Sequence, residues 1–233
     1  SIQYKLSERE RKSIMILTDG TTSLDYFESF PTDIKSVGLS LSGGADSTLA
    51  FYCLLKTLSD RNQDTLVYGY DTFRTVARSY EAADAVYEYI VSLFNIEVPP
   101  LHTFAFYKNK AVGKYEWFFP NYIYLKNKYN IEDMITSMTL GMPDRKRPNW
   151  NEDKYDLTEE EVIEMSKEAP LRFPFATVDK KFIAHQYRTL GLSDLSALTS
   201  SCAGDQKVPC KKCWWCEERY WAFKSYDGDK IRS

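Results

Sequence analysis

Long apolar runs are missing from this 233-residue sequence. No stretch reaches the ~20 apolar residues that a membrane-spanning helix needs, and the first residues, with Glu8 and Glu10 among several Lys and Arg, lack the apolar core of a signal peptide. The sequence also has no excess of positive charge, because its 30 Lys and Arg residues are outnumbered by 33 Asp and Glu residues, which gives a net charge of −3. That balance gives no electrostatic basis for non-specific nucleic-acid binding. We expect a cytoplasmic protein that binds neither a membrane nor a nucleic acid.

Internal repeats, low-complexity tracts and a recognisable linker are absent as well. A chain of this length forms one large domain or one domain with a small appendage, and it buries roughly 70% or more of its unfolded surface. We expect an N-terminal extension over residues 1–35, an α/β domain over residues 36–195, and a C-terminal segment over residues 196–233 that packs on the same core.

Apolar runs typical of buried strands alternate with helical patterns in the central part of the sequence. Strands are predicted at residues 36–41, 65–70, 101–106 and 135–141, and apolar residues recur at helical spacing from residue 79 to 94. This alternation predicts an α/β fold with a doubly wound parallel sheet, in which ligands bind beyond the carboxyl ends of the strands. A strand-like run is also found at 13–17. Further helices are expected from the end of the first strand to about residue 58, and over residues 115–129, 157–168 and 180–190. A charged surface loop is expected at 143–154.

A glycine-rich turn links the first of these strands to its helix. Residues 42–48 read Ser-Gly-Gly-Ala-Asp-Ser-Thr. Two glycines let the backbone turn tightly and approach a ligand, and the hydroxyls of Ser42, Ser47 and Thr48 join the N–H groups of the helix start, where partial positive charge accumulates. The segment predicts a phosphate-binding loop, with a plain strand–helix connection as the alternative. No Gly-Lys-Ser/Thr follows, so it is not the loop of the common NTPases.

Four of the five cysteines form a cluster near the C-terminus, at Cys202, Cys210, Cys213 and Cys216. Four thiolates are the usual ligand set of a closed tetrahedral zinc site. Disulfides are the first alternative, and they are disfavoured in a reducing compartment. An iron–sulfur cluster is the second, because Cys-x2-Cys-x2-Cys also occurs in ferredoxin-like runs. We expect a structural zinc, because four thiolates leave no coordination position for a catalytic water, and we take Cys53 as an inert core residue.

With the glycine turn and the cysteines in one chain, the sequence resembles the PP-loop ATP pyrophosphatase superfamily, and within it the 7-cyano-7-deazaguanine synthase family. That family has an SGGxDS loop. Its second strand ends in an Asp, which is followed by a segment with Arg and by a helix that carries a Glu. Late in its sequence a Lys begins a helix, and Leu-Gly and Ser-Cys follow. It also has an Asp-Tyr…Tyr-Pro-Asp-Cys-Arg substrate segment, for which this chain offers only residues 140–145, without a cysteine. The matching positions are residues 42–47, Tyr70-Asp71, Arg74 or Arg78, Glu81, Asp179-Lys180, Leu190-Gly191 and Ser201-Cys202.

The resemblance implies a PP-loop, adenine-nucleotide alpha-hydrolase-like fold and an ATP-dependent carbon–nitrogen ligase. In that family the carboxylate of 7-carboxy-7-deazaguanine attacks the α-phosphate of ATP, pyrophosphate leaves, ammonia displaces AMP, and a second adenylation gives the nitrile precursor of queuosine. Asp46, Ser47 and Lys180 would be catalytic, with Mg²⁺ beside ATP as co-substrate and zinc as a structural ion. Arg74, Asp144 and Arg145 would bind the heterocyclic acid. The residues implied to bind ATP are Ser40, Leu41, Ser42, Gly43, Gly44, Ala45, Asp46, Ser47, Thr48 and Asp71.

Other functions remain open at this point. The chain could be a PP-loop adenylating enzyme, such as an amidotransferase or a sulfur-transfer relative, that acts on a different acid. A reductase relative would need a redox cysteine outside the cluster, and only Cys53 is spare. A catalytically silent nucleotide-binding homologue is the third possibility, although such a protein has no reason to keep Ser42, Asp46 and Ser47 together. A homodimer is also left open.

Overall fold

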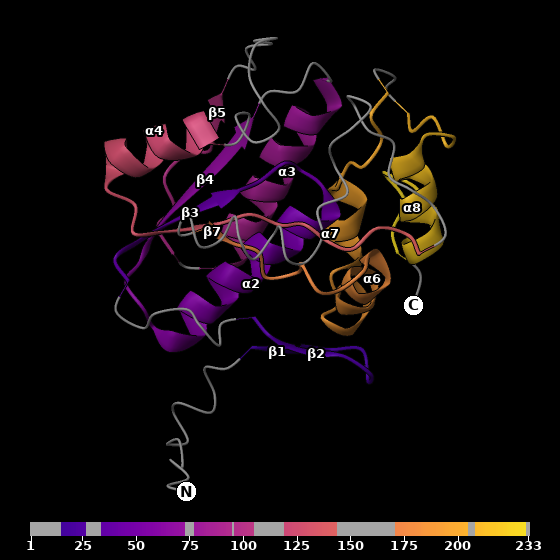
Figure 1. Ribbon diagram of the computed structural model, residues 1–233, viewed down its shortest axis with the longest axis horizontal. Coiled ribbons are helices and arrows are strands. Elements are labelled where there is room, and N and C mark those ends of the chain that lie inside the picture. The colour runs from indigo at the N-terminus through magenta and orange to yellow at the C-terminus, as the bar shows by residue number, and fades with distance from the viewer. Residues whose placement is uncertain are drawn as a thin grey trace, which may run out of the picture.

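Five parallel strands form the central sheet of the protein, for which a computed structural model describes residues 15–26, 34–72, 77–94, 96–104, 119–143, 171–204 and 208–231 (Figure 1). Every neighbouring pair of strands in this sheet is parallel. The α/β class and the parallel sheet expected from the sequence are therefore confirmed. The strands are β3 (Ser36–Ser40), β4 (Leu66–Thr72), β5 (His102–Phe104), β6 (Asp133–Ile135) and β7 (Leu171–Arg172), and they lie in the order β5-β4-β3-β6-β7.

This strand order places a switch in direction next to β3. Numbered along the sheet's own chain order, the strands run 3-2-1-4-5, which is the arrangement of doubly wound nucleotide-binding sheets. The chain moves outward on one side of β3 through β4 and β5, and on the other side through β6 and β7. In sheets of this kind ligands bind outside the carboxyl ends of the two strands at the switch. Those strands are β3 and β6.

Helices cover both faces of the sheet. On one face Val37 and Leu39 of β3 and Val67 of β4 belong to a large apolar cluster with α2 (Ala45–Arg61), α3 (Ala77–Leu93) and α6 (Lys180–Thr189). On the other face a smaller cluster joins Tyr70 to Leu125 of α4 (Phe119–Tyr129). Figure 1 shows α4 on the opposite side of the sheet from α2 and α3. Alternate residues of one buried strand thus serve two layers, as the period of two in a strand requires.

One glycine permits close packing at the centre of the sheet. A Cβ on Gly38 of β3 would lie 2.1 Å from the Sδ atom of Met134 on the neighbouring β6. Met134 is fully buried, so its thioether fills the space that a side chain at position 38 would take. The close approach explains why β3, whose five residues are all buried, carries a glycine in mid-strand.

The residues before β3 form a small separate sheet. Strands β1 (Ile16–Thr18) and β2 (Ser23–Asp25) pair antiparallel, where a single strand at 13–17 was expected. The hairpin is attached to the main body by hydrogen bonds from Gln186 of α6 to the Thr18 carbonyl, 3.0 Å, and from the Tyr26 hydroxyl to the Ala50 carbonyl, 2.8 Å. Tyr26 also belongs to the large apolar cluster. This part of the N-terminal extension therefore packs on the core of the α/β domain.

One strand prediction was wrong in its position. The run at 135–141 was expected to be a strand, but β6 covers only Asp133–Ile135. Beyond it the chain leaves the sheet: the Leu140 N–H donates to the Val178 carbonyl at 2.9 Å, and Leu140 forms an isolated bridge with Asp179. The apolar run is thus a connection across the carboxyl ends of the strands. The expected helix at 157–168 and most of the expected loop at 143–154 lie outside the described residues.

The remaining helices lie close to their expected places. Helix α6 begins at Lys180 as expected, and Asp179 caps it by accepting hydrogen bonds from the N–H groups of Lys181 and Phe182. It is followed by α7 (Ser193–Leu198) and α8 (Trp214–Phe223). No helix within the described part of the chain is long and apolar enough to cross a membrane.

Candidate functional site

The glycine turn follows β3, next to the switch in strand order. Gly43 has a φ of 71°, in the left-handed region that residues with a Cβ rarely adopt. Gly44 is the N-cap of α2 and makes no side-chain cap hydrogen bond. An N-cap side chain therefore does not occupy the N–H groups of the first helical turn, which together with the helix dipole form a common anion-binding geometry.

The hydroxyl of Ser47 braces this turn from inside. It accepts a hydrogen bond from the Ser42 N–H at 3.1 Å, lies 3.1 Å from the Ser42 hydroxyl and donates to the Gly44 carbonyl at 3.2 Å. Ser47 and Thr48 are both buried, whereas Ser42 is partly exposed. The sequence indicated all three hydroxyls as phosphate ligands. In the structure the hydroxyl of Ser47 bonds within the turn itself.

A lysine from a distant part of the chain meets the start of α2. The Lys180 Nζ donates to Asp46 Oδ2 at 2.5 Å, across 134 positions of sequence. The same Nζ lies 3.7 Å from Glu218 Oε2 on α8. Lys180 is 7% exposed and Glu218 is 3% exposed, and charged residues are seldom buried to this extent unless they are paired. The structure thus joins Asp46 and Lys180, which were predicted as catalytic, and adds Glu218.

Sequence reasoning missed Glu218. The residue follows Cys216 by two positions, in the run Glu217-Glu218-Arg219, where carboxylates resemble a solvated helix face. The only sign in the sequence that Glu218 has a function was its position among the cysteines predicted to bind a metal. Its approach to Lys180 depends on how α8 docks against α6, and no local spacing expresses that contact.

One oxygen of Asp46 has no bonding partner within the described residues. Its Oδ2 is taken by Lys180, whereas its Oδ1 is buried and makes no hydrogen bond there. A buried polar atom without a partner is unfavourable, and such atoms often mark the place of a ligand or ion. Carboxylate oxygens are the ligands that Mg²⁺ prefers, usually beside substrate phosphates. One carboxylate oxygen does not identify the ligand, so the Mg²⁺ expected from the sequence stays a prediction.

The other residues predicted to bind ATP surround this turn in part. Ser40, Leu41 and Ala45 are buried, and the Leu41 N–H donates to the Tyr70 carbonyl at 2.7 Å. The backbone of Asp71 lies in β4, one position beyond the pair that Tyr70 makes with Ser40, and so at the same end of the sheet. Arg74, Asp144 and Arg145, predicted to bind the acid, lie outside the described residues.

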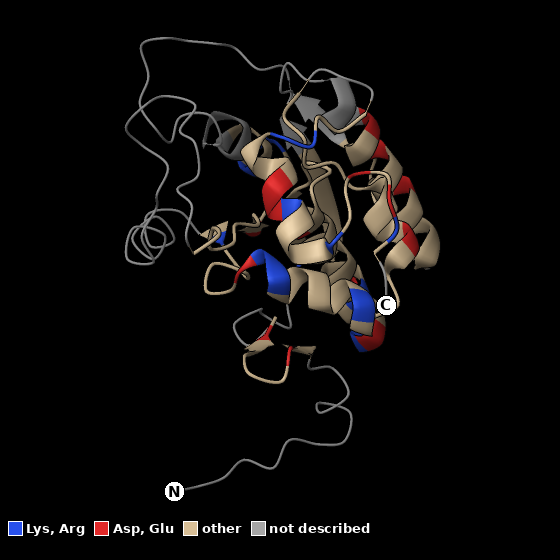
Figure 2. Cartoon of the chain, turned by 90° about the vertical axis from the view of Figure 1, so that its right-hand side faces the viewer, with Lys and Arg blue, Asp and Glu red and all other residues tan. Residues whose placement is uncertain are grey.

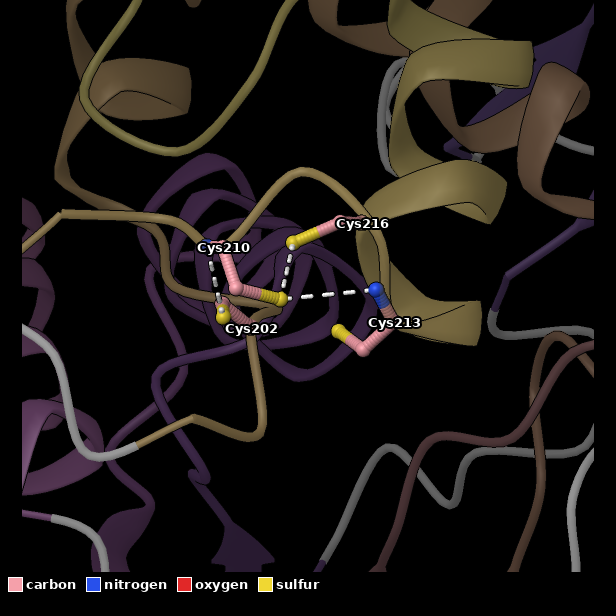
Figure 3. A group of neighbouring side chains, drawn as sticks. All are labelled: Cys202, Cys210, Cys213 and Cys216. Carbon is pink, nitrogen blue, oxygen red and sulfur yellow. Dashed lines mark hydrogen bonds between the residues drawn. The ribbon is translucent and has the colours of Figure 1, made fainter.

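The four clustered cysteines come together as expected (Figure 3). Their sulfur atoms all lie within 4.8 Å of one another, and the Sγ atoms of Cys210 and Cys216 are 3.9 Å apart. A tetrahedral zinc with Zn–S bonds of about 2.3 Å separates its sulfurs by about 3.8 Å. All four cysteines are free, so the disulfide alternative is not what the structure contains. The group could hold a metal ion such as zinc.

Backbone N–H groups point at the sulfurs in this cluster. The N–H groups of Gly204 and Cys210 donate to Cys202 Sγ at 3.4 and 3.3 Å, and the Cys213 N–H donates to Cys210 Sγ at 3.4 Å. Such bonds stabilise a thiolate more than a thiol. Lys211 has a φ of 58°, a left-handed conformation that turns the chain between two of the cysteines.

The thiols differ in how readily they ionise. The backbone N–H of Lys212 is the main factor that lowers the pKa of Cys210, to about 6. Burial raises the pKa of Cys213 and that of Cys216. Four thiolates this close together repel one another, so full ionisation requires a cation between them.

The glycine turn and the cysteine cluster are linked by the short segment between α7 and Cys202. The Ser200 N–H donates to the carbonyl of Gly43 at 2.9 Å. Cys202 follows two residues later, so the loop that carries the first metal-ligand candidate also bonds to the glycine turn. Figure 2 shows basic and acidic segments next to one another on the helices that face the viewer.

Comparison of the sequence with models of known protein families gives no match, and a search of the curated proteins gives none either.

Proposed function

We propose that the protein is an ATP-dependent carbon–nitrogen ligase of the PP-loop type. It would convert 7-carboxy-7-deazaguanine, or an acid like it, and ammonia into the nitrile, with release of AMP and pyrophosphate. The proposal rests on the resemblance of the motifs, and one structural observation carries it. A buried lysine, Lys180, is held 2.5 Å from Asp46 in the first turn of a helix whose N-cap glycine leaves the helix start open.

The residues at the turn suit a leaving pyrophosphate. When a carboxylate oxygen attacks the α-phosphorus, the bond between that phosphorus and the bridging oxygen breaks, and negative charge grows on the β-phosphate. The N–H groups at the start of α2 and the ammonium of Lys180 would then meet that charge in a largely buried place, where fixed dipoles stabilise a transition state most. Mg²⁺, held through Asp46, would supply further neutralisation of the phosphate charge.

The later steps need ammonia and a second ATP. Attack of ammonia on the acyl-adenylate forms the amide and releases AMP and a proton. The amide oxygen then attacks a second α-phosphorus, pyrophosphate leaves again, and loss of AMP and a proton yields the nitrile. The same turn can serve both adenylations, because each one ends in the same leaving group.

The cysteine cluster has a supporting role in this proposal. Four thiolates around a zinc ion leave no position for a substrate or a water, so the ion would crosslink the segment that carries Glu218 instead of taking part in the chemistry.

The test is product analysis by mass spectrometry after incubation with ATP, Mg²⁺, ammonium and 7-carboxy-7-deazaguanine. AMP, pyrophosphate and the nitrile are expected. Lys180→Ala should reduce AMP formation about 100-fold or more, which is typical for loss of one preorganised charge. The neighbouring variant Lys181→Ala, at an exposed position of the same helix, is the matched control.

Two outcomes would change the proposal. Formation of ADP and phosphate by the wild type would show a different phosphate chemistry and overturn it. Cleavage to AMP with no binding or conversion of the deazaguanine acid would keep the adenylation and withdraw the named substrate, leaving a PP-loop ligase for another acid.

A further inference from the structure

We propose that the metal cluster sets the conformation of the glycine turn through one buried carboxylate, Asp227, which makes Asp227 a positioning residue for nucleotide binding. The part of this inference that concerns nucleotide rests on the proposed function, whereas the mechanical connection does not. The connection consists of Ser200, Ser201, Cys202, Arg219 and Asp227, and we call it the Asp227 bridge.

The first link of the Asp227 bridge is at the turn. The carbonyl of Gly43 accepts the Ser200 N–H at 2.9 Å. A Cβ on Gly44 would lie 3.8 Å from the Ser200 carbonyl oxygen, so the loop around residue 200 packs directly on the turn. Gly43 is in the left-handed region, and the peptide that follows it leads into the N–H groups at the start of α2. A shift of Ser200 would therefore reorient the part of the turn that faces a phosphate.

The second link joins the next two residues to Asp227. Its Oδ2 accepts hydrogen bonds from the Ser201 N–H at 2.9 Å and from the Cys202 N–H at 2.8 Å. Three consecutive N–H groups thus have fixed acceptors, one on the turn and two on a single carboxylate. Because Cys202 is also one of the four clustered thiols, its backbone and its sulfur are held from two sides.

The third link joins Asp227 to α8. The Arg219 Nε lies 3.3 Å from Asp227 Oδ1, and each side chain is only 1% exposed. The other two guanidinium nitrogens of Arg219 donate to the Thr199 hydroxyl at 2.6 Å and to the Ser196 carbonyl at 2.7 Å. One arginine therefore ties both Asp227 and the residue before Ser200 to the helix on which it lies.

The cysteines hold the two ends of the Asp227 bridge. Cys202 lies at one end, and at the other end Cys213 is the N-cap of α8 and Cys216 lies in its first turn, three residues before Arg219. A metal bound by these thiolates would fix the start of α8 relative to Cys202. Without the ion the four sulfur atoms share no common ligand, and the two ends lose their crosslink.

Helix α8 reaches the phosphate site by a second route as well. Glu218, next to Arg219, places its Oε2 3.7 Å from the Lys180 Nζ. Displacement of α8 would thus disturb the lysine and the glycine turn together. Errors of about 1 Å in the placement of binding groups reduce function up to about 100-fold, so we expect removal of the metal to weaken MgATP binding at least about tenfold.

Hydrogen–deuterium exchange tests the connection without any use of activity. The zinc-loaded protein is compared with the same protein after zinc removal by a chelator, and peptides that cover residues 41–48 and 196–204 are followed. Exchange should rise in both peptides after removal, while the peptide over β4 stays unchanged. Calorimetric titration with MgATP on the same two samples gives the change in affinity.

The variant Asp227→Asn distinguishes the effect of the Asp227 bridge from the effect of metal binding. The variant should bind one zinc per chain yet show the raised exchange over residues 41–48 with zinc present. Asp194→Asn, at an exposed ion pair with Lys230 on the same part of the chain, is the control and should behave as the wild type. If Asp227→Asn does not fold, Asp227→Glu, which keeps the charge but displaces the carboxylate from the Ser201 and Cys202 N–H groups, takes its place in the same comparison.

The inference is overturned if chelation leaves exchange over residues 41–48 unchanged, or if Asp227→Asn keeps the metal-dependent protection of that peptide. If the wild type binds no MgATP in either state, the proposed function and the nucleotide part of the inference fail, and the exchange result still decides the mechanical connection.

Discussion

The glycine turn and the cysteine cluster are neighbours in the fold, but different contacts give them their shape. The turn is held by the core on which it lies. Leu41 and Ala45 are buried at its two ends. The Leu41 N–H bonds to the neighbouring strand, and the hydroxyl of Tyr187 on α6 donates to the Ala45 carbonyl at 3.0 Å. A turn fixed in this way is largely formed before a nucleotide arrives, and the contact from the Ser200 N–H to the Gly43 carbonyl couples it to the cysteine cluster.

Within the part of the chain that the structure describes, the cysteine cluster is less enclosed than the turn. Cys210 and Cys213 are half-buried, and three N–H···S hydrogen bonds are the main polar contacts among the four residues. Its thiols need a cation before they can ionise together. The comparison teaches that a site built on a sheet is preformed, whereas a site built from thiolates takes its final shape from the ion that it binds.

Loss of a ligand cysteine should have the largest effect, and it acts first on the cluster. Structural zinc in small domains binds with about 10–16 kcal/mol, and most of that free energy goes into folding. Cys202→Ala should therefore lower the metal content from about one ion per chain to near zero and lower the Tm. Elemental analysis and thermal unfolding measure both. Cys53→Ala, in the core of α2, is the control and should retain the metal.

If the Cys202→Ala protein keeps its full metal content, the four cysteines do not form one site. Iron together with acid-labile sulfide in the wild type would replace zinc by an iron–sulfur cluster.

Loss of the buried lysine is the next largest change, and it addresses the turn. Lys180→Met leaves Asp46 and Glu218 as buried carboxylates without the cation between them. Removal of one member of a buried ion pair destabilises a protein by about 3–5 kcal/mol. We expect a loss near the lower limit, about 3 kcal/mol, because Asp46 keeps some solvent contact.

A double variant sharpens this result. Lys180→Met with Glu218→Gln should recover part of the lost stability, because one of the two carboxylates that faced the lysine becomes neutral. Chemical denaturation of the two single variants and the double variant gives the coupling free energy. Additive effects would mean that Lys180 and Glu218 do not interact.

The sheet beneath the turn can be tested at Gly38. Gly38→Ala places a methyl group where the Met134 thioether lies, and overpacking of a buried site destabilises by about 1–3 kcal/mol. The metal content should not change, since the cluster does not depend on this strand. Relief of the effect by Met134→Ala would confirm the collision, whereas a stable Gly38→Ala protein with no compensating shift would contradict it.

The β1–β2 hairpin is a reference region that touches neither site, and there we expect the smallest effect. The Thr22 N–H is the main factor that lowers the pKa of Asp19 to about 2, with help from the hydroxyl and N–H of Thr21. A lowered pKa means that this contribution to stability is complete above the unfolded value of 3.8 and is lost as the pH falls through 2.

The stability difference between wild type and Asp19→Asn should therefore shrink between pH 4 and pH 2. An NMR titration that finds the Asp19 pKa near its unfolded value would contradict the expected hydrogen bonds. Metal content and nucleotide binding should be the same in both proteins.

The sequence was sufficient for those features that depend on local spacing. The glycine turn, the start of α6 at Lys180 and the four cysteines all follow from short patterns, in which residue type and position along one element decide the outcome. The apolar run at 135–141 misled, because such a run is also what a buried connection looks like.

The contacts that join the elements could not be read from spacing. Glu218, Arg219 and Asp227 look like ordinary surface charges in the sequence, yet all three are buried. Arg219 and Asp227 pair with each other, and their other partners and that of Glu218 lie about 20 to 40 positions away, on elements whose docking depends on the whole core. Charged residues in such places are recognised only when the fold shows what surrounds them.

The separation of Asp46 and Lys180 in the sequence also affects the order of events while the chain is synthesised. At about 5–20 residues per second, a ribosome needs between about 7 and 27 seconds to make the 134 positions that separate the two residues. During that interval β3 can pair first with β4, about 30 positions on, and later with β6, which starts at Asp133. All five strands of the sheet are therefore synthesised before Lys180, and until then the Asp46 carboxylate lacks its cation. Burial of that carboxylate is among the last events of folding, because its lysine has to be synthesised first.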